Sequence, residues 1–281
     1  MFETPGNEAL TAILAACPLR AQVTDNATYC GQWRDNEPNH DAAWFHLISS
    51  GECWVEMKSL PQRLHLRAGD FVIFPQGSAH TLCGKAGARS DDFTTMICGE
   101  LHFVPRGRNP LREGLPEIFV VREAEGGAAF QRLGELLCQE CHRKEAGSQA
   151  VLDKLAEALF AMALRQFLLS GADRRGLLAA LADPRLAKAL AAMHARPGHD
   201  WTVAELAGIA AMSRTAFAEH FAQIVGESPI HHLTRWRMLQ AQLLLADPRR
   251  SVVAVAQELG YQTEAAFRRR YKEIVGHGPG L

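Results

Sequence analysis

The chain has 281 residues, of which 47% are hydrophobic, 22% charged and 7% aromatic. This composition excludes a disordered chain, a collagen-like repeat and a small disulfide scaffold, and the length predicts two domains. No run of about 18 apolar residues occurs, and no basic segment followed by an apolar stretch opens the chain, so we expect neither a membrane span nor a secretory signal. The sequence therefore predicts a cytoplasmic protein with no membrane partner.

Charge and cysteines are distributed unevenly along the chain, whose formal net charge is −1. Residues 183–281 contain 12 lysines and arginines against 9 acidic residues, and the remaining residues have a net charge of −4. A basic C-terminal part suggests contact with a polyanion such as nucleic acid. All seven cysteines lie before residue 142, and their odd number predicts thiols that are buried, bind a metal or undergo redox chemistry.

The N-terminal part predicts a small antiparallel β barrel or sandwich followed by helices. Short apolar or alternating runs recur between residues 22 and 105, for example Trp44–Ile48 and Phe71–Phe74, with turn residues between them. Residues 152–168 have the apolar spacing of one buried helix face, and residues 128–143 can pair with them as a helical hairpin. We expect an α+β protein with domains at 1–170 and 183–281, joined by a linker at 171–182.

Residues 183–281 are expected to be helical, because helix-start signals recur along them. Asp183 and Pro184 combine an N-cap with proline at the first helical position, and Thr202 and Glu205 have the spacing of a capping box. Further N-caps are expected at Ser213, Ser228, Ser251 and Thr263.

The helical part contains two copies of one unit, 50 residues apart. The segment SRTAFAEHFAQIVGESP aligns with TEAAFRRRYKEIVGHGP, which pairs Phe217 with Phe267 and Phe221 with Tyr271. Each copy predicts a short helix, a tight turn and a longer helix whose aromatic residues face the core. The opposite face of the longer helix is then free to enter the major groove, as in a helix-turn-helix. A helical bundle duplicated only for stability is the alternative.

Over residues 183–279 the sequence resembles the DNA-binding domain of AraC/XylS-type transcription regulators, in the segments MSR, RWRM and TEAAFRRRYK. The resemblance implies two recognition helices that read adjacent major-groove segments of double-stranded DNA. It assigns DNA-facing positions to Arg214, Thr215, Ala218 and Glu219 in the first helix and to Glu264, Ala265, Arg268 and Arg269 in the second. The family usually continues into a further helix, whereas this chain stops at Leu281, so weaker packing of the second unit is expected.

The N-terminal part contains a pattern that fits the second cupin motif. Gly69 is followed after five residues by Pro75, then by Gly77 and, two residues later, by His80. The pattern indicates a jelly-roll barrel with the histidine pointing inward. His46 is expected on a facing strand, although the His-x-His of the first motif is absent. His46 and His80, with Cys98 or His102, could hold a transition metal such as zinc, and polar core residues or ligand donors are the alternative.

The whole N-terminal half also resembles an AraC subfamily with a cupin sensor, in the segments WFHLISSG, LRAGDFVIFPQGSAHTL and MICGELHF. Reactive-chlorine-sensing regulators belong to this group, and in them two cysteines form a disulfide on oxidation. The resemblance assigns Cys98 as one of the two and Cys30 as the other, with Cys17 as the alternative to Cys30. Nearby positive charge, from Arg89 and His102, is expected to lower the pKa of Cys98. If these cysteines are buried hydrophobic residues instead, they have no redox role.

The sequence thus predicts a DNA-binding transcription regulator rather than an enzyme, with a cupin domain that senses oxidant through cysteine oxidation. A regulator that responds to a metal or small molecule without redox chemistry is the alternative, and a metal-dependent cupin enzyme is a further one. Expected partners are operator DNA, RNA polymerase for an activator, and a second copy of the chain. The apolar stripe Leu152, Leu155, Leu159 and Phe160 predicts where that homodimer forms, although part of the stripe must cover the barrel.

Overall fold

The computed structural model describes residues 5–104, 109–143, 145–170 and 176–279. The chain forms two compact units, each built from more than one stretch of sequence. The barrel unit contains Leu19–Phe103 and Leu115–Asp173, and the helical unit contains Met1–Pro18, Val104–Gly114 and Arg174–Leu281. The expected division into a strand-rich N-terminal part and a helical C-terminal part is confirmed, although two N-terminal segments belong to the helical unit.

The barrel unit consists of two antiparallel sheets. One has the strand order β1-β8-β3-β6-β9 and the other the order β2-β7-β4-β5. The strands are β1 (Leu19–Cys30), β2 (Arg34–Glu37), β3 (Ala43–Ser50), β4 (Glu52–Glu56), β5 (Leu64–Arg67), β6 (Phe71–Phe74), β7 (His80–Cys83), β8 (Phe93–Phe103) and β9 (Phe119–Val121). Because β1 lies at the edge of its sheet, β8 is the one described strand with which it pairs.

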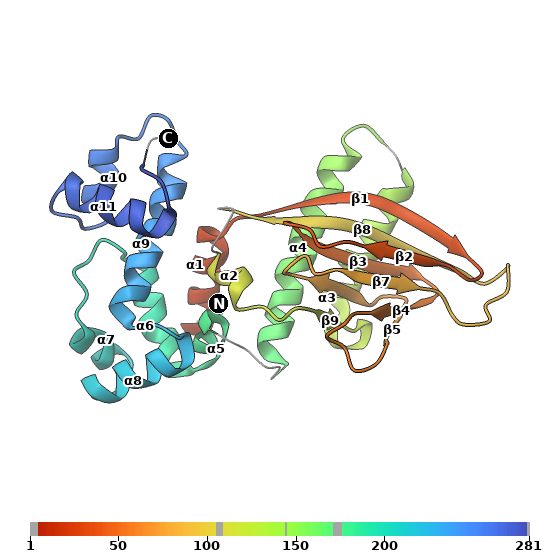
Figure 1. Cartoon of the computed structure of the whole chain (residues 1–281), viewed down its shortest axis with the longest axis horizontal. Coiled ribbons are helices and arrows are strands. Elements are labelled where there is room, and N and C mark those ends of the chain that lie inside the picture. Colours follow the sequence, from red (N-terminus) through yellow and green to blue (C-terminus); the bar gives the residue numbers. More distant parts are fainter. Residues whose placement is uncertain (1–4, 105–108, 144, 171–175, 280–281) are drawn as a thin grey trace. The chain divides into compact units, whose positions relative to one another are not determined.

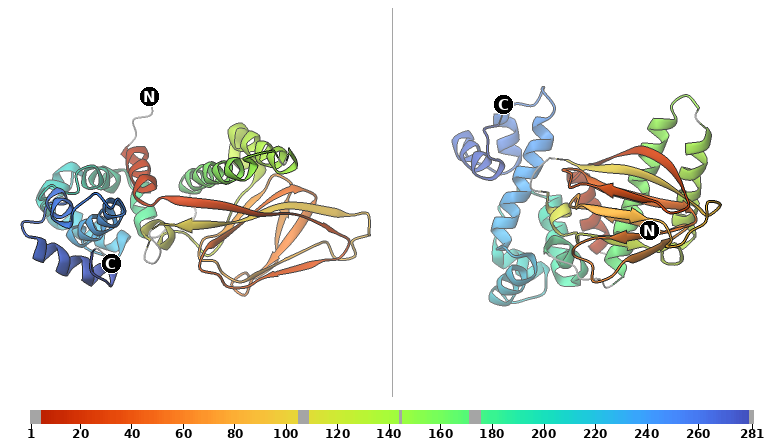
Figure 2. Two further views of the ribbon diagram at one scale, coloured as in Figure 1. Left: turned by 90° about the horizontal axis from the view of Figure 1, so that it is seen from above. Right: turned by 45° about the vertical axis from the view of Figure 1, so that its right-hand side comes forward.

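Side chains alternate between the two faces of the first sheet, so one face lies inside the barrel and the other packs against helices. Residues such as Ile48, Val72 and Met96 face the second sheet and pack with Val55 and Leu82 inside the barrel. The residues at the alternate positions of the same strands point to the other face of the sheet. This face is covered by the helices α3 (Glu123–Arg143) and α4 (Ser148–Leu169), as Figures 1 and 2 show. Three ring contacts join this face to the helices: Phe71 to Phe130, Phe103 to Phe160, and Phe119 to Phe167.

The expected helical hairpin therefore exists, and its apolar stripe is largely used within the barrel unit. Leu152, Leu159 and Phe160 are buried, and Leu155 is half-buried. A dimer contact on α3 and α4 would instead have to use outward residues such as Leu136 and Val151, which are 43% and 45% exposed.

The helical unit contains α1 (Pro5–Ala16), α2 (Pro110–Glu113), α5 (Gly176–Ala182), α6 (Pro184–Ala195), α7 (Val203–Ile209), α8 (Arg214–Val225), α9 (Pro229–Leu245), α10 (Val252–Glu258) and α11 (Glu264–Val275). The N-caps expected from the sequence begin α6 to α11, including the reciprocal capping box of Thr202 and Glu205. Of the expected linker, residues 171–175 lie outside the described residues, and residues 176–182 form α5. Leu177, Leu178 and Leu181 of α5 are buried, because this helix packs on α6 and α8.

Candidate functional site

Two helix-turn-helix units flank the long helix α9 (Figure 1). In the first, α7 and α8 are joined through a turn at Ala211, whose φ of 52° is left-handed. In the second, α10 and α11 are joined through Gly260, whose φ is 81°, and the second turn is one residue longer. Glycine tolerates this conformation better than alanine does, so the first turn is the more strained of the two.

The aromatic pairs of the repeat face inward, as the sequence predicted. Phe217, Phe221 and Phe267 are fully buried, and Tyr271 is 4% exposed. Both recognition helices, α8 and α11, therefore turn their other faces outward. The assigned DNA-facing residues lie there: Arg214, Thr215, Glu219, Ala265, Arg268 and Arg269 are exposed, and Ala218 and Glu264 are half-buried.

The arginines of these faces differ in their surroundings. The Nε of Arg268 donates a 2.6 Å hydrogen bond to Oε1 of Glu264, and a guanidinium nitrogen of Arg268 lies 3.4 Å from the carbonyl oxygen of Pro279. Arg214 and Arg269 form no ion pair or hydrogen bond with another described side chain. Arg269 can therefore bind a phosphate or a guanine without first giving up a partner.

A hydrogen-bonded chain of three side chains crosses the barrel interior. The Nδ1 of His46 lies 3.1 Å from the Sγ of Cys98, and its Nε2 lies 3.0 Å from the Nε2 of His80. The Nδ1 of His80 lies 2.9 Å from the carbonyl oxygen of Ser78. His46 is fully buried, His80 is 4% exposed, and Cys98 is 8% exposed.

These contacts assign the histidine tautomers when both rings are neutral. A carbonyl can only accept, so His80 donates from Nδ1 and accepts at Nε2. His46 then donates from Nε2 and accepts at Nδ1 from the thiol of Cys98. Burial supports the neutral rings, because it lowers the pKa of His46 well below its ordinary value and that of His80 to about 4.

The pKa of Cys98 is raised, chiefly by burial and then by the carboxylates of Asp25, Glu37 and Asp35. The expected lowering of this pKa by Arg89 and His102 is therefore wrong. Arg89 pairs with Asp91 in an exposed turn, and His102 pairs with Glu100 at 3.0 Å. The thiol of Cys98 is protonated at neutral pH, and His46 is the base in contact with it.

The residues that surround the two barrel histidines do not fit a metal site of three or four ligands. His46 faces His80 with Nε2 but faces Cys98 with Nδ1, on the other side of its ring. One ion therefore cannot bind Cys98 and the Nε2 atoms of both histidines together. Among the described residues no group of three or more metal-binding side chains is present, and His102 is paired with Glu100. The hydrogen-bonded chain accounts for the buried histidines without a metal.

The structure does not bring Cys30 and Cys98 together. In the antiparallel ladder of β1 and β8, Cys30 pairs with Phe93 and Cys98 pairs with Asp25. The two cysteines are thus about 16 Å apart along the sheet, at about 3.3 Å per residue, whereas a disulfide needs Cα atoms within about 7 Å. Cys30 is exposed at the end of β1, and Cys17 is buried in the helical unit beside Leu111.

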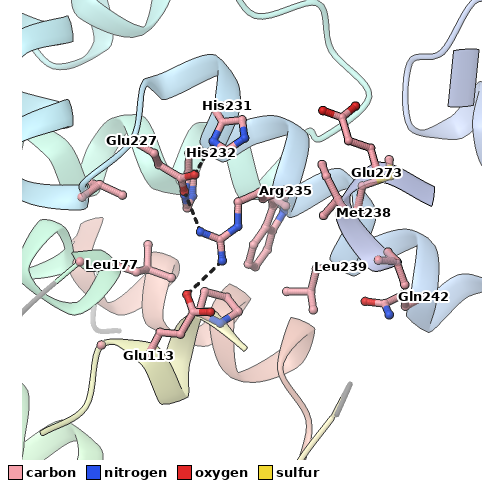
Figure 3. Close-up of a pocket in the computed structure, with 17 residues that line it drawn as sticks. Glu113, Leu177, Glu227, His231, His232, Arg235, Met238, Leu239, Gln242 and Glu273 are labelled. Carbon is pink, nitrogen blue, oxygen red and sulfur yellow. Dashed lines mark hydrogen bonds and ion pairs between the residues drawn. The ribbon is translucent and has the colours of Figure 1, made fainter. Parts of the chain in front are cut away.

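The helical unit also contains a cavity of about 540 Å³, lined by α2, α5, α9 and the ends of α8 and α11 (Figure 3). Arg235 of α9 extends between two carboxylates there, at 3.0 Å from Glu113 and 3.4 Å from Glu227. Glu227 also accepts hydrogen bonds from His231 and His232. Burial alone would raise the pKa of Glu227, but the hydrogen bond from His232 and the charge of Arg235 lower it to about 2.

Known protein families match both the barrel part and the helical part of the chain. Residues 8–169 match the cupin family and residues 206–280 match a helix-turn-helix domain family. An uncharacterized HTH-type transcriptional regulator of Haemophilus influenzae is 32% identical over 93% of each chain. The RCS-specific HTH-type transcriptional activator RclR of Escherichia coli is 30% identical over 84% of this chain and 82% of its own. The chain belongs to the AraC-like transcription regulators with a cupin domain.

As an AraC-like regulator, the protein binds DNA through its helix-turn-helix domain and is not an enzyme. The solved DNA-binding domain of AdpA, in complex with a target DNA, is 33% identical over 33% of this chain and 84% of that chain, with a TM-score of 0.31. Within the described part of the regulator, no helix combines the length and hydrophobicity that a bilayer crossing requires.

Sequence reasoning missed two features of this regulator. The first is the hydrogen bond between His46 and Cys98, which were grouped only as candidate metal ligands and which pair directly across β3 and β8. The second is the ion pair of Glu113 with Arg235, which joins residues 122 positions apart. Strand alternation could have placed His46 and Cys98 on the same face, but no pattern in the sequence indicates the Glu113 contact.

Proposed function

We propose that this regulator controls transcription in response to strong oxidants of the reactive-chlorine class, and that Cys98 is the thiol that reacts. The observation that carries the proposal is the hydrogen bond between Cys98 and His46 inside the barrel. A second support is the name of the 30%-identical RclR, which describes an RCS-specific activator. Because the pKa of Cys98 is raised, weak oxidants that need a preformed thiolate should react slowly.

The chemistry needs one oxidant molecule per disulfide. As the sulfur of Cys98 attacks the chlorine of hypochlorous acid, its proton passes to Nδ1 of His46, and the leaving hydroxide takes up a proton from solvent to become water. His46 can pass a proton on from Nε2 to His80, because that nitrogen of His80 is the acceptor. The thiol of Cys30 then attacks the sulfenyl chloride, which forms the S–S bond and releases chloride and a proton. Two sulfur atoms lose two electrons in total, and the chlorine gains them.

The second step requires Cys30 to move, and β1 is built so that its far half can separate from the sheet. A β-bulge at Thr24 interrupts the ladder directly beside Cys98. Before the bulge, α4 holds β1, since Asp153 accepts from the amide of Val23 and Gln149 donates to its carbonyl. After the bulge, Asp25–Cys30 contains no fully buried residue. Detachment of this edge segment breaks its pairing with β8 and the contacts of Tyr29, which stacks on Trp33 and donates a hydrogen bond to Asp35. Once these contacts open, Cys30 can fold back toward Cys98.

Peptide mapping after one equivalent of hypochlorite tests the proposal, alongside Cys98→Ser, Cys30→Ser and His46→Phe variants in an oxidant-responsive DNA-binding assay. We expect a Cys30–Cys98 disulfide and no response in either cysteine variant. In His46→Phe we expect about 100-fold slower oxidation of Cys98, the lower end of a typical general-base contribution. Cys83→Ser is the matched control, because Cys83 is also a buried strand cysteine but bonds to Trp54 and Glu56.

An oxidant response that survives in Cys98→Ser would refute the redox proposal and favour a small-molecule signal. A disulfide from Cys98 to Cys53, which shares the barrel core with it, would keep Cys98 as the sensor but replace Cys30. Stoichiometric metal in the purified protein would contradict our interpretation of the barrel histidines.

Dimerisation is part of the proposal, because operator binding by a dimer increases affinity through a second contact. The exposed side chains of Leu136 and Val151 lie on the outer helices of the barrel unit and provide the apolar surface for a second copy. As an activator, the dimer would also contact RNA polymerase.

A further inference from the structure

One segment that precedes the DNA-binding domain in the sequence is built into the helical unit. The chain leaves the barrel unit after Phe103, the last residue of β8, and returns to it at Leu115. Between these points α2 packs on α5, with Leu111 fully buried and Asn109 capping the helix. Strand β8 carries Cys98, so the proposed redox residue and α2 lie on one continuous stretch of chain.

Arg235 connects α2 to the end of the first recognition helix. Its two terminal nitrogens bond in opposite directions, one to Glu113 of α2 at 3.0 Å and the other to Glu227 at 3.4 Å (Figure 3). Glu227 directly follows Gly226, which caps the C-terminal end of α8. One guanidinium thus bridges the last residue of α2 and the first residue beyond the cap of α8.

This bridge rests on ion pairs rather than on close apolar packing. The 540 Å³ cavity lies around Arg235, with residues of both α2 and α9 in its wall. The side chain of Arg235 is 23% exposed, that of Glu227 12% and that of Glu113 44%. The Arg235–Glu113 ion pair is exposed on its Glu113 side, so it breaks and re-forms at a lower free-energy cost than a packed apolar interface does.

We propose that Glu113, Arg235 and Glu227 form the joint through which the state of the barrel strand β8 reaches the recognition helix α8. The inference takes its signal from the proposed oxidant response, whereas the joint itself does not depend on that response. The joint acts on α8 and not directly on α11, since Glu227 belongs to the first helix-turn-helix unit. Breaking the joint should therefore uncouple the first recognition helix from the sensor while the second keeps its contacts.

Hydrogen exchange tests the joint without any oxidant. In Glu113→Ala we expect the amides of the last turn of α8, including the Gly226 amide bonded to Ala222, to exchange about threefold or more faster, as expected for a lost local constraint. Amides of α11 should be unchanged. Asp91→Asn is the control, because it removes a carboxylate from the exposed Arg89 ion pair in the barrel unit. Glu113→Asp should restore part of the protection, and Arg235→Lys should not, since an ammonium lacks the fork that spans both carboxylates.

The second measurement is the ratio of operator affinities before and after hypochlorite. In Glu113→Ala this ratio should fall toward 1 by about threefold or more, while mass spectrometry finds Cys98 oxidised as in the parent. Exchange in α8 equal to that of the parent would overturn the joint, and so would an affinity ratio that differs from 1 in the parent and is undiminished in Glu113→Ala. If exchange changes as expected but oxidant alters DNA binding in neither protein, the joint stands and the redox proposal fails.

Discussion

Replacing Arg269 with alanine should weaken operator binding more than any other single change on α11. Arg269 is exposed on the DNA-facing side and pairs with no other described side chain, whereas Arg268 must first leave Glu264, to which it bonds at 2.6 Å. A lost bidentate contact to guanine lowers affinity by about 1–3 kcal/mol, and a lost phosphate contact lowers the salt slope by about 0.9. We expect about a tenfold loss of affinity, or about 1.4 kcal/mol.

Fluorescence anisotropy with an operator duplex selected from a random library measures both quantities. Between about 50 and 200 mM salt, the variant should lose about threefold less affinity than the parent, because it releases one counterion fewer. Arg268→Ala should show a smaller loss of affinity. Arg165→Ala, which removes the same charge from an exposed position of α4, should show no loss. Unchanged affinity and unchanged salt slope in Arg269→Ala would refute the assignment of this face to DNA.

Three further predictions concern stability and assembly. Ser213→Ala removes the hydroxyl that accepts from the amide of Ala216 at the start of α8, so thermal unfolding should show a loss of about 1 kcal/mol. The pKa of Glu227 falls from its ordinary value of 4.5 to about 2 in the folded protein. The ionised carboxylate therefore stabilises the fold fully above pH 4.5, and this stabilisation is lost as the pH falls toward 2. Urea unfolding should therefore find Glu227→Gln less stable than the parent at pH 6, by up to about 3 kcal/mol, and closer to it at pH 3. Leu136→Lys with Val151→Lys should convert a dimer to a monomer in sedimentation velocity, and a parent that is already monomeric at micromolar concentration would contradict the assembly proposal.

The helical part of the fold could be predicted closely because its signals are local. Each N-cap from Asp183 to Thr263 is a short side chain that bonds to an amide two or three residues away, so its effect does not depend on distant packing. The aromatic pairs Phe217/Phe221 and Phe267/Tyr271 are also local, since positions i and i+4 share one helix face. The positions of the recognition helices, and which of their faces points outward, follow from these patterns alone.

The features that could not be predicted depend on contacts between distant residues. The stripe on α4 is apolar whether it covers a barrel or a second subunit, and only the structure shows Phe160 against Phe103. The pKa of Cys98 is raised first by burial and then by Asp25, Glu37 and Asp35. Strand pairing places Asp25 beside Cys98, whereas Glu37 and Asp35 belong to β2 in the other sheet. Positive residues close in sequence, such as Arg89, gave the opposite expectation because sequence distance is a poor guide to distance across a sheet.

The position of the bulge in β1 connects the chemistry of Cys98 with its mechanical effect. A disulfide requires Cys30 to cross about 16 Å, so the ladder between β1 and β8 has to open from Cys30 as far as the position of Cys98. Because the bulge lies at Thr24, beside Cys98, only Asp25–Cys30 has to detach, and α4 retains the half of β1 that continues toward α1. The retained half still pairs with the end of β8 through Leu19 and Phe103, and a bond from the Val104 amide to Pro18 extends this pairing. Oxidation would then act on β8 at Cys98 while its other end, from which α2 follows, stays in the ladder, and the Glu113–Arg235 ion pair is a partly exposed contact that joins α2 to α9.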